Sequence, residues 1–134
     1  MKKHLLFWCI LFCNAAVAQT FSGGTGTESD PYLISNVSDL KELSNMTDTP
    51  GADGTQQTYG KFFRLTQDIT EPFVGMIGYE GFFKGDFDGG GHCITLNINM
   101  PTDNYVGLFG TVKSGAVHDL AVSGSVVGCN YVGG

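Results

Sequence analysis

The chain has no apolar run long enough to cross a membrane, although it opens with a short one. A basic stretch, Lys2-Lys3-His4, precedes the apolar run from Leu5 to Cys13, whereas a membrane-spanning helix needs about 20 apolar residues. The run is followed by Ala16-Val17-Ala18, the small-x-small pattern that signal peptidases recognise. The sequence therefore predicts an exported chain, cleaved between Ala18 and Gln19, that is not inserted into a membrane afterwards.

Cysteine is scarce in the exported part. Two of the four cysteines, Cys9 and Cys13, leave with the signal peptide, so that Cys93 and Cys129 remain. Two cysteines are too few for a small protein held together by disulfides. One bridge between them is conceivable, but their spacing of 36 residues does not match the repeat described below. We therefore expect two free thiols.

Basic residues are few as well. Residues 19–134 hold 5 lysines and arginines against 13 aspartates and glutamates, which gives a formal net charge of −8. Phosphate backbones and anionic lipid heads repel an acidic chain, and this argues against nucleic-acid binding and against peripheral membrane binding. The length that remains after cleavage suits one domain.

Motifs of known reaction centres are missing too. The sequence contains no GxSxG nucleophile elbow, no HExxH metalloprotease motif, no P-loop and no dinucleotide-binding fingerprint. His92 and Cys93 are adjacent, and adjacent residues of a strand point to opposite faces, so they cannot form a nucleophile and base pair. We expect no catalytic, cofactor-binding or metal-binding residue in this chain.

The feature that is present is a 26-residue repeat. The tetrapeptide NYVG occurs at 104–107 and returns at 130–133. A period in the twenties is typical of solenoids. Other like residues are separated by the same interval: Tyr79 and Tyr105, Gly81 and Gly107, Gly89 and Gly115, His92 and His118, Ile94 and Leu120, and Leu96 and Val122.

The local pattern indicates strands. Ile94, Leu96 and Ile98 alternate with polar residues, as expected for a strand with one buried face, and glycine-rich turns separate such runs. Short strands at a fixed interval predict an all-β solenoid with coils of about 26 residues and parallel strands about 4.8 Å apart. An antiparallel sandwich also has short strands and tight turns, but nothing in it would keep like residues at one interval.

The N-terminal part has a different pattern. Pro31 opens a short strand, and Ser38 is the predicted N-cap of a short helix with Leu40 and Leu43 on one face. A solenoid needs such a cap because its first coil exposes an unpaired strand edge and an apolar interior. The predicted organisation is a signal peptide over 1–18, a flexible segment over 19–30, a cap and loop over 31–58, and β-helix coils over 59–134.

Five stretches carry a resemblance to a known family: GTESDPYLISNVSDLKELS, YGKFFRLTQDIT, GFFKGDFDGGGHCITLNI, NYVGLFG and GAVHDLAVSGSVVGCNYVGG. They resemble the GLUG-motif repeat proteins, which are secreted or surface-attached bacterial proteins. These are similar to regions of filamentous-haemagglutinin-type adhesins and to segments flanking some surface immunoglobulin A peptidases. The resemblance covers essentially the whole exported chain. It implies a right-handed parallel β-helix with a display, adhesion or spacing role, and glycans or surface proteins as partners.

The chain departs from the family's motif in one copy. The usual motif is Tyr-Val-Gly-Gly followed by an apolar residue, any residue and glycine. The copy at 105–110 has leucine in place of the second glycine, and the copy at 131–134 has both glycines but not the residues that follow them. Because the second copy ends inside the motif, we expect the chain to be an N-terminal fragment that continues into further repeats.

Asp86 and Asp88 are the first candidate for chemistry. They flank Phe87 and would project from one outer face, where two carboxylates could act as the acid and base of a glycosidase or begin a calcium site. The 26-residue register, however, places Val112 and Ser114 beside them, so the neighbouring coil adds no acid. We expect Asp88 to close a turn and Asp86 to be solvated.

Stacked residues supply two further candidates. His92 and His118 would share one register position with Asp119 and Cys93 nearby, yet a structural zinc site needs four ligands, and we expect no metal. A ladder of Tyr79, Tyr105 and Tyr131 could form a carbohydrate-binding strip, but burial of the rings at a corner of the coil is favoured because it removes aromatic surface from water.

The sequence thus favours a non-catalytic, exported β-helix of the bacterial cell surface, adhesin-like or serving as a scaffold or spacer for a longer protein. Two alternatives stay open. One is the N-terminal part of a β-helix polysaccharide lyase or hydrolase, and the other is the repeat segment of a surface metallopeptidase.

Overall fold

The computed structural model describes residues 21–133, and the predicted signal peptide with its cleavage site lies outside them. The described part contains seven strands and one helix. In chain order these are β1 (Tyr32–Ile34), α1 (Val37–Asp48), β2 (Phe62–Leu65), β3 (Ile69–Phe73), β4 (Asp86–Asp88), β5 (Cys93–Asn99), β6 (Ala116–His118) and β7 (Ala121–Val127).

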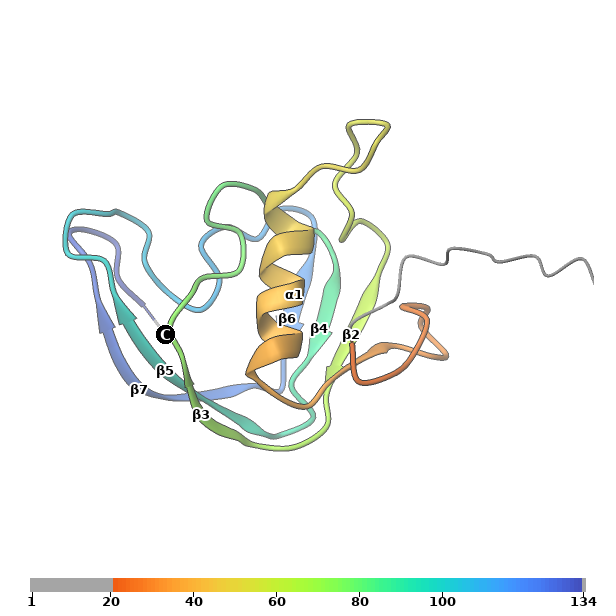
Figure 1. The fold of residues 1–134 in the computed structure, drawn as a ribbon, viewed down its shortest axis with the longest axis horizontal. Helices are drawn as coiled ribbons and strands as arrows, with labels where there is room; N and C mark the ends of the chain where they lie inside the picture. The colour runs from red at the N-terminus through yellow and green to blue at the C-terminus, as the bar shows by residue number, and fades with distance from the viewer. Residues whose placement is uncertain (1–20, 134) are drawn as a thin grey trace, which may run out of the picture.

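The strands form two parallel sheets (Figure 1). Sheet A has the order β1-β2-β4-β6, and sheet B has the order β3-β5-β7. From β2 onward the chain alternates between the sheets, and each strand pairs in parallel with the next strand of its own sheet. The prediction of a strand-rich fold is confirmed. The antiparallel sandwich is wrong for residues 21–133.

The register of the sheets is not a constant 26 residues. Asn104 does pair with Asn130, at the predicted interval. Ile94 pairs with Val122, two residues beyond the predicted Leu120, and in sheet A Asp86 pairs with Ala116. The turns between the sheets differ in length, so the interval changes from one part of a sheet to another. A shift of two residues leaves the same strand face buried, because side chains alternate with a period of two.

The core lies between the two sheets and is rich in phenylalanine. The ring of Phe83 contacts those of Phe63 and Phe109, with ring centres 5.8 and 5.2 Å apart. Strand β5 contributes Ile94, Leu96 and Ile98, all buried, as its alternating pattern predicts. Packed aromatic and branched side chains of this kind supply most of the stabilisation of a fold, at roughly 25 cal/mol per Å² of apolar surface removed from water.

Helix α1 lies across the space between the two sheets (Figure 1). Its side chains Leu40 and Leu43 are fully buried in the same core. The N-cap is Asn36, whose side-chain oxygen accepts a hydrogen bond from the backbone N–H of Asp39 at 3.0 Å. The prediction of Ser38 as the cap is therefore wrong by two residues, because Asn36 is itself a favoured N-cap residue and has the extended backbone a cap requires.

Residues 21–30, expected to be flexible from their composition, run beside the outer edge of β1. The backbone N–H of Ser22 donates to the carbonyl of Leu33, and the N–H of Leu33 donates to the carbonyl of Gly23, at 3.2 and 2.9 Å. The buried carboxylate of Asp39 accepts hydrogen bonds from the hydroxyl of Ser22 and the N–H of Ser35. One end of sheet A is thus covered by the chain itself.

The opposite end of both sheets is uncovered in the described residues. All of β6 is exposed, and so is β7 apart from Val126. Apolar side chains are among these residues: Val117 and Val122 are 37% exposed and Val127 is 42% exposed. One end of the sheets is therefore covered by the chain, whereas the other end is exposed in the described residues.

Candidate functional site

A row of ionisable side chains crosses three neighbouring strands of sheet A. Arg64 on β2 pairs in register with Asp88 on β4, and Asp88 pairs with His118 on β6. The Arg64 Nε donates to Asp88 Oδ2 at 3.0 Å. Parallel pairing places equivalent side chains directly beside one another, which is why residues so far apart in sequence meet here.

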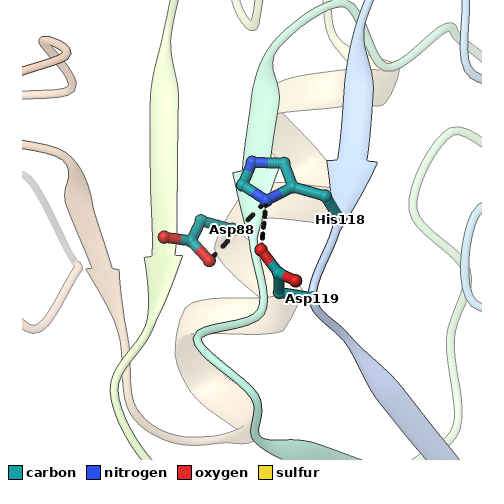
Figure 2. A group of neighbouring side chains, drawn as sticks. All are labelled: Asp88, His118 and Asp119. Carbon is teal, nitrogen blue, oxygen red and sulfur yellow. Dashed lines mark hydrogen bonds and ion pairs between the residues drawn. The ribbon is translucent and has the colours of Figure 1, made fainter.

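His118 is the centre of this cluster. Its Nε2 lies 2.9 Å from Asp86 Oδ1, and its Nδ1 lies 2.9 Å from Asp119 Oδ2 and 3.9 Å from Asp88 Oδ1. Figure 2 shows the carboxylates of Asp88 and Asp119 approaching the same ring nitrogen. Both ring nitrogens face acceptors, an arrangement that only the protonated imidazole satisfies, because the neutral ring has a single N–H donor.

The pKa shifts agree with this geometry. Hydrogen bonds to Asp119 and then to Asp86 raise the pKa of His118 above its ordinary value of 6.5. The backbone N–H of Gly90 and then the Arg64 side chain lower the pKa of Asp88. The geometry thus favours a protonated His118 beside the Arg64–Asp88 ion pair, and in that form the ring has no free lone pair with which to act as a general base.

Metal binding would have to displace this ionic arrangement. Ligand atoms of Asp88, His118 and Asp119 lie within 4.8 Å of one another, so these three residues could supply a cation with one nitrogen and two oxygen ligands. Imidazole must be neutral to bind a metal, whereas its carboxylate neighbours favour the proton. Asp88 is also engaged by Arg64. As it stands, the cluster cross-links β2, β4 and β6 electrostatically.

The sequence predicts the wrong neighbours for Asp86 and Asp88. The sequence identifies Asp86 and Asp88 as a pair, but the 26-residue register sets the wrong residues beside them, since His118 of the next coil lies beside both carboxylates. An alignment of the strands that precede the turns, Asp86–Asp88 with Ala116–His118, would have placed His118 beside Asp88. The observed partners of Asp86 and Asp88 are Ala116 and His118, in place of Val112 and Ser114.

The predicted histidine stack is also wrong. His92 lies at the start of β5, with its Nδ1 3.4 Å from Asp68 Oδ1, whereas His118 ends β6 in the other sheet. The two histidines are therefore out of register, although the turns that follow β4 and β6 are neighbours: the N–H of Ala121 donates to the carbonyl of His92 at 3.0 Å. Cys93 and Cys129 are free thiols, the first half-buried and the second exposed.

The tyrosine ladder is present for two of its three members. The rings of Tyr105 and Tyr131 stack with centres 4.8 Å apart and planes 5° from parallel. The prediction that they are buried at a corner is wrong, since they are 60% and 74% exposed, and the next residue, Val106, enters the core instead. Tyr79 does not belong to this stack. Ile77 pairs with Phe109, so the register places Tyr79 beside the segment that follows Phe109 and not beside Tyr105.

The His118 cluster should make stability depend on pH. A raised pKa in the folded state means that the contribution of His118 is fully present below about pH 6.5 and is lost as the pH rises through the folded pKa. The variant His118→Gln should therefore lose more free energy of unfolding, relative to the unmodified protein, at about pH 6 than at about pH 9. Urea denaturation at the two pH values measures this.

The titration of the His118 ring provides an independent control. NMR titration should give His118 a higher pKa in the unmodified protein than in Asp119→Asn, which removes the leading hydrogen bond. An unchanged titration would contradict the assigned role of Asp119.

Comparison with known proteins places the chain beside segments of much longer ones. It is 31% identical over 142 residues to a Gly-rich membrane protein of Evansella cellulosilytica, covering 90% of this chain and 15% of that protein. It is also 31% identical over 128 residues to halomucin of Haloquadratum walsbyi, covering 82% of this chain and 1% of that protein. No family model and no solved structure matches. The described residues contain no helix with the length and apolar content that a membrane crossing requires.

Proposed function

We propose that this chain is a segment of a right-handed parallel β-helix in an exported bacterial surface protein, where it serves as a non-catalytic, adhesin-like scaffold or spacer. The observation that carries the proposal is the alternation of the chain between two all-parallel sheets. Outside the two sheets, the equivalent residues Asn104 and Asn130 form an isolated parallel bridge, and their side chains are hydrogen-bonded at 3.0 Å. Stacking of like on like is characteristic of solenoids.

The ionisable cluster supports a scaffold rather than an enzyme. His118 is engaged at both nitrogens, and Arg64 neutralises Asp88, so the residues best placed for acid and base work are committed to one another. Catalytic groups usually keep a free lone pair or proton aimed at the substrate. The resemblance to the GLUG-motif proteins and the names of the two relatives, one of them a membrane protein, favour a location at the surface.

The uncovered edges of β6 and β7 favour further coils as the partner of this segment. The N-terminal end is covered by residues 21–30 and α1, while valines remain exposed at the other end. Solenoid coils bury their apolar faces only by stacking on neighbours. The similar segments in the relatives are parts of much longer chains, which is consistent with this arrangement.

A cell-surface assay tests the location. The full-length protein, carrying an epitope tag in the exposed loop at Asp53-Gly54, should be labelled by antibody on intact cells and removed by added protease. Retention of the tagged protein in the cytoplasm would contradict the proposal.

An activity assay tests the scaffold role against the enzyme alternative. Purified protein incubated with a panel of polysaccharides should release no new reducing ends or unsaturated sugars. Turnover that disappears in Asp86→Asn would favour the lyase or hydrolase instead.

A further inference from the structure

A second feature is a groove across sheet A near the starts of its strands, which shares Asp86 with the His118 cluster. The groove has a volume of about 430 Å³ and is formed by three neighbouring segments of chain: 59–62, 84–86 and 114–116. This volume falls within the range of about 300 to 1,000 Å³ that is usual for small-molecule sites. We call it the lysine groove, after Lys61 and Lys84, which line it.

The floor of the lysine groove is bare backbone. A side chain at Gly85 would come within 2.8 Å of the Lys61 carbonyl oxygen, and one at Gly115 within 2.6 Å of the Gly85 carbonyl oxygen. Neither distance is compatible with a real Cβ atom, so the close stacking of the three segments requires glycine at both positions. Glycine at these positions thus lets the three segments that line the groove stack closely.

The groove holds two lysines and one acid, Asp86, whose carboxylate is paired with His118 Nε2 at 2.9 Å. The exported chain carries 5 basic residues in all, and two of them line this groove. Arg64 is paired with Asp88, and Lys113 lies over the ring of Phe82. Within residues 21–133, Lys61 and Lys84 make no ion pair. Their ammonium groups are therefore available to an anionic ligand.

An aromatic face completes the groove. Tyr59 lines it and is 69% exposed, and within the described residues its ring stacks on no other ring. An exposed aromatic side chain combines an apolar face with a polar tip, which suits the mixed C–H and hydroxyl surface of a pyranose ring.

We infer that the lysine groove binds an acidic polysaccharide of the hexuronate class. Lys61 and Lys84 pair with carboxylates of the sugar chain, and Tyr59 stacks on a sugar ring. The groove runs across the strands, so it can follow an extended chain over three segments spaced about 4.8 Å apart. Nucleic acid fits less well, because its denser charge is repelled by the acidic remainder of the protein. The inference does not depend on the scaffold role.

Calorimetric titration of the exported chain with tetragalacturonate tests this site, with neutral cellotetraose as the matched sugar. Tetragalacturonate should bind with a Kd of about 1 mM or tighter, and cellotetraose at least about tenfold more weakly. Lys61→Gln and Lys84→Gln should each weaken binding about fivefold, the effect of one exposed ion pair, and Tyr59→Ala should weaken it further. Lys41→Gln, on α1 outside the groove, is the matched control and should leave binding unchanged.

Four results would overturn the inference. The first is an absence of saturable binding. The second is equal weakening by Lys41→Gln and Lys61→Gln, which would indicate a diffuse charge effect. The third is loss of binding in Tyr131→Ala but not in Tyr59→Ala, which would move the sugar site to the exposed tyrosine ladder. Competition by sodium acetate at equal carboxylate concentration would identify a site for simple carboxylates rather than for a polysaccharide. Circular dichroism of each variant checks that the fold is retained.

Discussion

Replacement of Leu96 by aspartate should unfold the protein. Leu96 is 2% exposed and lies in the middle of β5, where it pairs with Phe73 on one side and Gly124 on the other. An ionised carboxylate there would have no partner, and burial of an unpaired charge costs more than the roughly 5 to 15 kcal/mol by which a typical domain is stable. The circular dichroism spectrum should therefore lose its strand signal at 25 °C.

The neighbouring residue provides the control for this substitution. Asn97 lies on the outer face of β5 and is exposed, so Asn97→Asp should change the free energy of unfolding by about 0.5 kcal/mol or less. Comparable losses in the two variants would mean that the buried and exposed faces of β5 are wrongly assigned. Urea denaturation of both proteins measures the difference.

The second large effect is expected at Gly124. This residue has a φ of +99°, which L-residues other than glycine rarely adopt, and a side chain there would overlap the carbonyl oxygen of Leu96 on the adjacent strand. The Gly124→Ala variant must therefore both strain its backbone and move β7 away from β5. We expect a loss of at least about 2 kcal/mol in the free energy of unfolding.

Gly91→Ala separates the two causes. Gly91 also has a positive φ, of +77°, but an added Cβ would meet nothing within 4 Å. In this variant only the backbone strain should lower the free energy of unfolding, by about 1 kcal/mol. If Gly124→Ala were no more destabilising than Gly91→Ala, close packing of β7 on β5 would be refuted. Thermal denaturation of both variants, together with hydrogen exchange of the β5 amides, provides the measurement.

Local features of the fold followed from the sequence, whereas the pairing between strands followed only in part. The alternation of Ile94, Leu96 and Ile98 correctly predicted a strand with one buried face, because that pattern depends on the strand alone. The partners of these residues depend on how many residues each turn contains. Turns differ in length, so a single interval derived from NYVG held at Asn104 and failed by two residues in β5.

The candidate site shows the same limit. Asp86 and Asp88 could be recognised from their spacing, but His118 could not be placed beside them, because in sheet A the partners of these residues are 30 positions away. The exposure of Tyr105 was missed for another reason. Tyr105 has a left-handed backbone, with a φ of +58°, while its neighbour Val106 occupies the core, and a repeat interval alone does not predict this local conformation.

The most direct test of the proposed β-helix is the register between β5 and β7. In a protein whose free cysteines are replaced by serine, the pair Asn97→Cys and Ser125→Cys joins residues that are aligned on adjacent strands. Mild oxidation should link them, because neighbouring parallel strands are about 4.8 Å apart and disulfides span Cα atoms up to about 7 Å apart. The pair Asn97→Cys and Ser123→Cys, at the 26-residue interval, should stay reduced. Linkage of the second pair instead of the first would contradict the register of β5 and β7, and linkage of neither pair would contradict the stacked arrangement.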